Sequence, residues 1–224
     1  MKKINRELIV EYLGDTPRRP IATIVGLPGL GLVGAGACSM MLSNSKCKPI
    51  TVARIVCTKM LSRLYVGEDG LAPSYDFQVE YIEIEHDSKN SGILLLVGRS
   101  QPPSGPSQFA LAEFTLGISK QNGIQWIMTV GGYQVPNLSE NRSVYVSSND
   151  LLTMKIGAQL GFKQLTGQVT GAAGLVAGLS KYMGFHGGCL LAETDGKAPD
   201  VKASESAYSA LGKLVSRIGS LVLP

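Results

Sequence analysis

The stretch IATIVGLPGLGLVG, residues 21–34, joins a strand-like segment to a run of glycines and decides how the rest of the chain is interpreted. Its first residues, 21–26, form an uninterrupted apolar run that is typical of a buried strand. Gly29, Gly31 and Gly34 then spell G-x-G-x-x-G. This pattern occurs in loops that bind the phosphates of dinucleotides, but glycines also permit sharp turns and close packing without any ligand.

A dinucleotide loop also needs an acidic residue about 20 residues further on, which binds the ribose hydroxyls. The sequence has no Asp or Glu between Asp15 and Glu68, and Arg54 stands near the end of the second predicted strand. An NADP-type site would use Arg54 for the 2′-phosphate, but the glycine pattern alone is weak support for it. No Gly-Lys-Ser/Thr follows, which excludes a P-loop. We therefore expect no cofactor.

Packing explains the same glycines more simply. We expect Gly29 and Gly31 to permit a sharp turn after Pro28, and Gly34 and Gly36 to let a following helix lie close to the sheet. A second set, Gly167, Gly171, Gly174 and Gly178, recurs at helical spacing. That set indicates either a subunit interface or a close contact inside the monomer, and we favour the contact inside the monomer.

Further apolar segments resemble the first one and alternate with helical patterns. The predicted buried strands are residues 21–26, 51–57, 92–98, 124–130 and 188–192. The segment 77–85 alternates apolar and polar residues, which predicts an edge strand with one face in water. Helices are expected at 106–122 and 199–219. The pattern predicts a single α/β domain over residues 1–224, with a largely parallel sheet covered by helices on both faces.

Composition limits the classes of function. The formal charge is +4, Lys and Arg are scattered, and nothing indicates a nucleic-acid partner. The uncharged segment 20–45 is long enough to cross a bilayer, but Pro28 and its glycines argue against a membrane span. The four cysteines form no C-x-x-C pair, so we expect no metal site and reduced thiols in the cytoplasm.

Ligands of open α/β sheets bind beyond the carboxyl ends of the strands. The residues at these predicted ends are Arg99, Ser100, Gln101, Gly131, Gly132, Tyr133, Glu193, Thr194 and Asp195. Together they predict a polar pocket with one cation and two acids. No nucleophile with a base is evident, and His186 is interpreted as a loop residue. We therefore expect no catalytic residues.

The same segments resemble a known family. GLPGLGLVG (26–34), GRSQPPS (98–104), GGY (131–133), GAAGLVAGL (171–179) and GGCLLAETDG followed by Asp200 occur in the order seen in the proteasome assembly chaperone 2 family, especially its archaeal members. The resemblance spans roughly residues 21–213. The signature positions that it covers are Gly26, Pro28, Gly29, Gly31, Gly34, the Gly131-Gly132-Tyr133 triplet and Leu190 to Thr194.

The resemblance implies a fold similar to that of purine nucleoside phosphorylases, self-association into small rings or compact oligomers, and a non-catalytic role in escorting proteasome α-subunits into rings. Some archaeal members end in a hydrophobic-Tyr-X tail that docks between α-subunits. This sequence has Leu223 in the place of the tyrosine, so we expect any proteasome contact to use the folded surface. The alternative is a nucleoside phosphorylase-like enzyme, or a protein that binds phosphate or nucleosides through Arg99 and Glu193.

Overall fold

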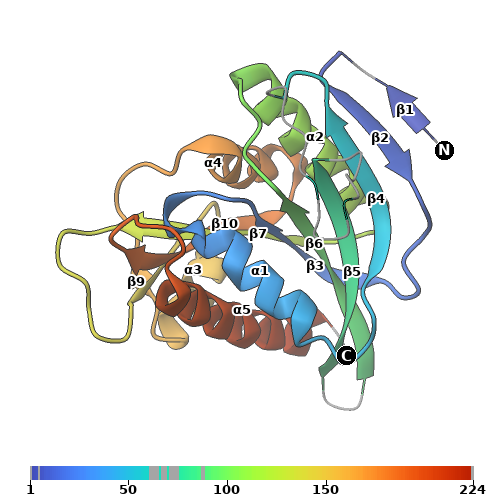
Figure 1. The fold of residues 1–224 in the computed structure, drawn as a ribbon. Helices are drawn as coiled ribbons and strands as arrows, with labels where there is room; N and C mark the ends of the chain where they lie inside the picture. The colour runs from blue at the N-terminus through green and yellow to red at the C-terminus, as the bar shows by residue number, and fades with distance from the viewer. Residues whose placement is uncertain are drawn as a thin grey trace.

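The computed structural model describes residues 2–4, 6–60, 66, 70, 76–86 and 89–222. One sheet runs through this part of the chain in the order β1-β2-β4-β5-β6-β3-β7-β10-β8-β9 (Figure 1). Its strands are β1 (Lys2–Ile4), β2 (Leu8–Tyr12), β3 (Pro20–Gly26), β4 (Ile50–Cys57), β5 (Phe77–His86), β6 (Lys89–Gly98), β7 (Trp126–Gln134), β8 (Val144–Ser148), β9 (Lys163–Gln164) and β10 (His186–Thr194).

The centre of the sheet is parallel. Strand β3 pairs in parallel with β6 on one side and with β7 on the other, and β7 pairs in parallel with β10. Every residue of β3 is buried, as the apolar run at its start predicts. The five predicted buried strands therefore exist, and four of them form this parallel centre.

The prediction of a largely parallel sheet is wrong, because the sheet is mixed. The pairs that run from β1 to β6 and the β10–β8 pair are antiparallel, whereas β8 and β9 at the other edge pair in parallel. The connection from β5 to β6 is too short for a helical crossover, so these strands form a hairpin. The prediction of an edge strand at 77–85 is also wrong, because β5 lies between β4 and β6. Its Glu80 is buried, where it accepts a hydrogen bond from Thr51 Oγ1 at 2.8 Å.

Helices cover both faces of the sheet, as predicted. The helices are α1 (Val33–Ser43), α2 (Gly105–Gln121), α3 (Leu151–Gln159), α4 (Gly171–Ser180) and α5 (Val201–Val222), with short 3-10 turns η1 (Leu30–Leu32) and η2 (Lys181–Met183). Helices α1 and α5 lie side by side on one face, and α2 and α4 contact each other on the opposite face (Figure 1). The predicted helices at 106–122 and 199–219 correspond to α2 and α5.

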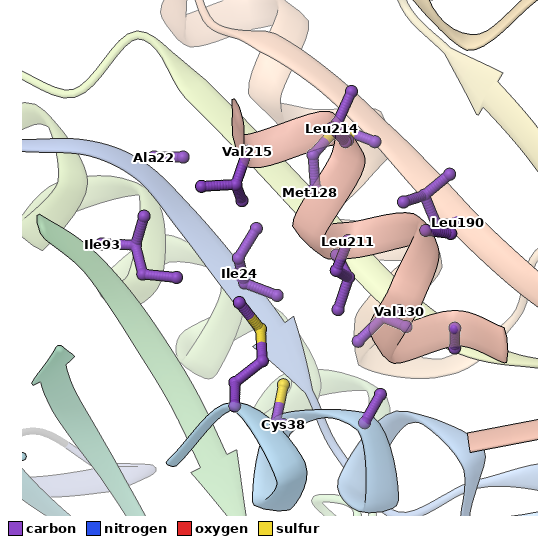
Figure 2. Packing of buried hydrophobic residues seen from close by; sticks show 14 of the residues in the cluster. Ala22, Ile24, Cys38, Ile93, Met128, Val130, Leu190, Leu211, Leu214 and Val215 are labelled. Atoms are coloured by element: carbon purple, nitrogen blue, oxygen red, sulfur yellow. The ribbon is translucent and has the colours of Figure 1, made fainter. Parts of the chain in front are cut away.

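The core under α1 and α5 is apolar and closely packed. Ile24 of β3 lies between Cys38 of α1 and Leu211 of α5, and Met128 of β7 packs in the same cluster near Leu214 of α5 (Figure 2). Burial raises the pKa of the Cys38 thiol to about 12, so this side chain stays protonated and packs as an apolar group. The residues at 223–224 lie outside the described residues, so the expectation about the tail stays a prediction.

Candidate functional site

The turn after β3 is held by the protein's own backbone. Gly31 has a φ of 62°, in the left-handed region that favours glycine, and a Cβ there would lie 2.6 Å from Thr194 Oγ1. The Asp200 N–H donates to the Gly31 carbonyl oxygen at 2.8 Å. Leu32 is also left-handed, with a φ of 56°. The sharp turn is therefore confirmed for Gly31, whereas Gly29 is extended and a Cβ there would meet only Gln101 Nε2, at 4.0 Å, so a glycine at 29 is not needed for the turn.

Close packing of the following helix against the sheet is confirmed for Gly34 and is wrong for Gly36. A Cβ on Gly34 would overlap the carbonyl oxygen of Val130, so this glycine lets α1 lie directly against the backbone of β7. A Cβ on Gly36 would overlap the Ser204 hydroxyl, which places Gly36 against α5 rather than against the sheet. The α1 side of the strand ends is thus filled by protein.

The α4 side of the same strand ends contains a cavity of about 450 Å³. It lies beyond β3 and β7 and beneath the start of α4. Its lining residues are Leu27, Gly29, Leu30, Gln101, Val130, Gly131, Gly132, Tyr133, Gln134, Gln168, Val169, Thr170, Gly171, Ala173 and Leu191. The Gln101 amide donates to the Pro28 carbonyl oxygen at 2.8 Å, which fixes the orientation of this side chain on the cavity wall.

Only some of the predicted pocket residues meet at this cavity. Gly29, Gln101 and the triplet at 131–133 line it, whereas Arg99, Glu193 and Thr194 do not. The predicted polar pocket with one cation and two acids is therefore wrong. The lining residues that the structure describes are apolar or uncharged, because each expected charge binds elsewhere in the protein.

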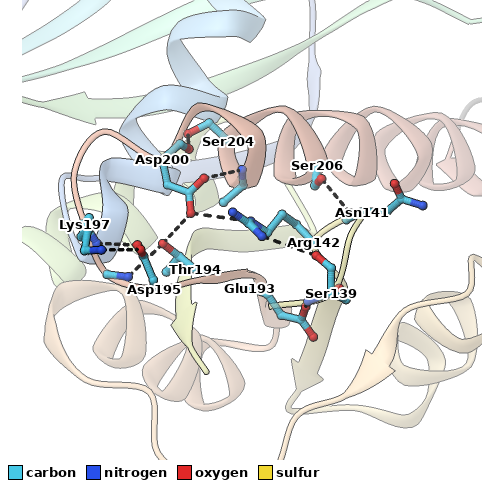
Figure 3. Close-up of polar contacts among 12 residues, drawn as sticks. Ser139, Asn141, Arg142, Glu193, Thr194, Asp195, Lys197, Asp200, Ser204 and Ser206 are labelled. Carbon is cyan, nitrogen blue, oxygen red and sulfur yellow. Dashed lines mark hydrogen bonds and ion pairs between the residues drawn. The ribbon is translucent and has the colours of Figure 1, made fainter. Parts of the chain in front are cut away.

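Glu193 is buried in a network that holds the loop between β7 and β8 (Figure 3). Its carboxylate accepts hydrogen bonds from the Ser139 N–H at 2.9 Å and hydroxyl, the Ser143 N–H at 3.2 Å and the Tyr145 hydroxyl at 3.1 Å. The Lys163 ammonium lies 3.7 Å away. Burial raises the pKa of Glu193, but these hydrogen bonds outweigh it and lower the pKa from 4.5 to about 2.

Thr194 and Arg99 have structural partners too. The Thr194 hydroxyl donates to Asp200 Oδ2 at 2.9 Å, and Asp200 Oδ1 accepts from the Ala203 N–H at 3.0 Å in the first turn of α5 (Figure 3). Burial raises the pKa of Asp76, and the Arg99 charge nearby partly offsets that effect. The Arg99 charge therefore stabilises the Asp76 carboxylate, which does not line the cavity.

The second glycine set does not form one contact surface. Gly171 begins α4 with a φ of 75°, and a Cβ on Gly174 would overlap the carbonyl oxygen of Val169, just before the helix. Gly178 is exposed, with open space around it. The favoured contact inside the monomer thus holds for Gly174 and fails for Gly178. A role of these glycines in a subunit interface stays a prediction.

Several lining residues have no recognisable signal in the sequence. Gln168, Val169 and Thr170 reach the cavity because they precede α4, whose start could not be placed from a glycine pattern. Ser139 lies 54 positions and Tyr145 lies 48 positions before Glu193 in the sequence. No local sequence pattern could therefore predict that they bind the Glu193 carboxylate.

A larger groove of about 610 Å³ lies elsewhere, between α1, β5 and α5. We place the candidate site at the smaller cavity because strand carboxyl ends are where open α/β sheets bind ligands.

None of the helices in the described part of the chain is long and apolar enough to span a membrane. The described residues contain no group of three or more His, Cys, Asp or Glu side chains able to hold a metal ion.

Comparisons with known proteins give the chain's relatives. An uncharacterised protein of Methanocaldococcus jannaschii, MJ1210, is 28% identical over 195 residues, covering 85% of this chain and 72% of the relative. The structure of PbaB from Pyrococcus furiosus, described as an archaeal proteasome activator, matches 97% of this chain and 95% of its own, with a TM-score of 0.82 and 22% identity.

A second Pyrococcus furiosus structure, that of PbaA, is described as an archaeal homologue of proteasome-assembly chaperone. It matches 95% of this chain and 86% of its own, with a TM-score of 0.75 and 19% identity. At these identities the two structures establish a shared fold. The similarity to the purine nucleoside phosphorylase fold stays a prediction. The model of the PAC2 family matches residues 23–218, and the chain therefore belongs to the PAC2 family.

Proposed function

We propose that this protein is a non-catalytic, chaperone-like factor that binds proteasome α-subunits or a related assembly factor. The observation that carries the proposal is the family match over residues 23–218, together with the shared fold of two relatives described in proteasome terms. Fold alone does not determine function, so the partner has to be tested directly.

We place the contact surface for such a partner at the carboxyl edge of the sheet. Leu30 is 47% exposed, Leu32 38% and Val201 56%. The first two flank Gly31, whose carbonyl oxygen binds the backbone N–H of Asp200, next to Val201. Exposed apolar side chains that gather in one region are typical of protein interaction sites. We assign the partner contact to these three residues.

The left-handed backbone at Leu32 supports that assignment. A non-glycine residue in this region costs about 1–2 kcal/mol, and such costs persist where the surrounding structure imposes them, often at functional sites. Here the strained turn places two leucine side chains partly in solvent, where they contribute little to the core. Contact with a partner would give these side chains a role.

The rival enzyme function has lost its main support. A phosphorylase-like reaction rests on the glycine turn together with Arg99 and Glu193, but neither of these two charged residues lines the cavity. The Glu193 carboxylate is fully engaged by Ser139, Ser143 and Tyr145. We therefore propose a protein that binds other proteins and does not use these residues for catalysis.

Native mass spectrometry of the full chain with unassembled α-subunits tests the proposal. We expect a complex that Leu30→Glu weakens at least about tenfold, because a charge in an apolar contact is poorly solvated. Leu151→Glu is the control, because Leu151 is 78% exposed at the start of α3, near the opposite edge of the sheet. Absence of a complex, also when a second family member is added, would contradict the proposal.

We further propose that the protein is a cytoplasmic homo-oligomer. The support is the family resemblance and the exposed apolar residues at the strand ends. Light scattering of the purified chain would give its mass directly, and a strict monomer at all concentrations would contradict this part of the proposal.

A further inference from the structure

The cavity beneath α4 lies where the connections of the parallel strands diverge. From β3 the chain continues into α1 on one face. Helix α2, which follows β6, and helix α4, which precedes β10, both lie on the other face. In open α/β sheets ligands bind at such a switch point, beyond the carboxyl ends of the strands. A volume of about 450 Å³ is within the range of small-molecule sites.

The lining favours a neutral ligand that donates hydrogen bonds. Among the described residues that line the cavity none carries a charge. The amide nitrogen of Gln101 donates to Pro28 O at 2.8 Å, and that of Gln134 donates to Asp195 O at 3.1 Å. Both carboxamides therefore have their donors fixed by main-chain oxygens, which leaves their Oε1 atoms as acceptors.

Gln101 Oε1 is buried and has no hydrogen-bond partner among the described residues. It lies beside Gly171, at a distance of 3.6 Å from the position that a Cβ on this glycine would take. A buried acceptor without a donor costs about 1–3 kcal/mol. A ligand N–H that reaches this atom, after a small displacement of the segment before α4, would remove that cost.

The remaining walls are apolar and one is aromatic. Leu27, Val130 and Leu191 line the cavity together with Tyr133. The centroids of the Tyr133 and Tyr145 rings are 5.0 Å apart, and the Tyr145 hydroxyl donates to the Glu193 carboxylate. The buried carboxylate thus positions Tyr133 through Tyr145 without entering the cavity itself.

We propose that this cavity binds a neutral nucleobase or nucleoside. Such a molecule has a flat ring for the apolar walls and N–H groups for glutamine oxygens, and carboxamide side chains are common partners of base edges. No cationic side chain among the described residues lines the cavity, so we expect free phosphate to bind less tightly than a neutral base or nucleoside. This inference concerns a ligand and does not depend on the proposed protein partner.

Isothermal titration calorimetry of the full chain tests the inference, with uracil, uridine, hypoxanthine, inosine and inorganic phosphate as separate probes. We expect a neutral base or nucleoside to bind, and phosphate to bind less tightly or not at all. Ala173→Leu adds volume from α4 into the cavity and should weaken binding at least about tenfold. Ala177→Leu is the matched control, since this residue lies one turn later on α4 and lines a different cavity.

Gln134→Leu provides a second variant, because its amide is exposed and its loss should leave the fold intact. We expect about tenfold weaker binding from the lost acceptor. Failure of all neutral probes to bind would overturn the inference. Binding that survives in both Ala173→Leu and Gln134→Leu, or binding of phosphate in preference to nucleosides, would overturn it as well. Each outcome is independent of complex formation with α-subunits.

Discussion

The two faces of the strand-end region use glycine in opposite ways. On the α1 face, a Cβ on Gly34 would overlap a carbonyl oxygen of β7, and a Cβ on Gly132 would lie 2.5 Å from Leu30 O. On the α4 face, a Cβ on Gly131 would meet only the end of the Leu191 side chain, at 3.3 Å, and one on Gly171 would lie 3.6 Å from Gln101. The first face is sealed by backbone contacts, whereas the second retains a cavity.

A glycine pattern in a sequence therefore does not show whether the glycines permit close packing or leave a cavity. Gly131 and Gly132 are neighbours in one strand, and their missing side chains point to opposite faces of the sheet. The missing side chain of Gly132 permits close contact with the main chain of Leu30, whereas the missing side chain of Gly131 leaves space. Substitutions on the two faces should therefore differ strongly in their effect on stability.

The largest effect is expected for Gly34→Ala. The added methyl group would overlap Val130 O and lie 3.0 Å from Leu27 O, so α1 would have to move away from β7. We expect a loss of at least about 3 kcal/mol in the free energy of unfolding, measured by urea denaturation. Gly117→Ala in α2 is the control, because nothing lies within 4 Å of its Cβ position, and it should gain up to about 1 kcal/mol. Equal effects of the two substitutions would contradict the sealed-face description.

A smaller effect is expected for the Glu193 network, which lies beside Tyr133 of the open face. The pKa of Glu193 is lowered from 4.5 to about 2 in the folded protein. Its contribution to stability is therefore complete above pH about 4.5 and is lost as the pH falls toward about 2. Glu193→Gln should cost about 2 kcal/mol at neutral pH, since it weakens hydrogen bonds to a charged acceptor.

Urea denaturation at a series of pH values measures this contribution. The difference in unfolding free energy between the wild type and Glu193→Gln should shrink as the pH falls from 4.5 toward 2. A difference that stays constant over this range would contradict the assigned pKa and its cause.

The smallest effect is expected for Leu32→Gly. Glycine removes the cost of the left-handed backbone at a φ of 56°, but it also increases the entropy of the unfolded chain. We expect a net gain of about 0.5 kcal/mol in thermal or urea unfolding. Binding to α-subunits should weaken in the same variant because a contact side chain is lost. A destabilised variant would indicate that the Leu32 side chain belongs to the core.

The strands of the parallel centre were predictable because each contains an apolar run that is typical of a buried strand. β3 is apolar apart from Thr23, and β10 contains the apolar run 188–192. A sheet covered on both faces buries such segments fully. The helices α2 and α5 were predictable from periodicity and end signals. The PAC2 family was identified from short motifs in a fixed order, and the family model confirms it.

The antiparallel flank and the cavity were not predictable in the same way. In β5, alternating glutamates resemble an exposed face, but Glu80 is buried by pairing with Thr51 of the neighbouring strand. The expected pocket failed because a strand-end position does not fix the direction of a side chain. Glu193 lies opposite Tyr133 in the sheet, yet only Tyr133 lines the cavity, because Ser139 and Tyr145 bind the carboxylate.

The adjacent substitutions Gly131→Ala and Gly132→Ala test the difference between the two faces most directly. Urea denaturation should give a loss of about 2–3 kcal/mol for Gly132→Ala, whose methyl group would lie 2.5 Å from Leu30 O. Gly131→Ala should change stability by no more than about 0.5 kcal/mol, because the end of the Leu191 side chain can move. Similar losses at both positions would mean that the α4 face is packed as tightly as the α1 face, with no space for a ligand.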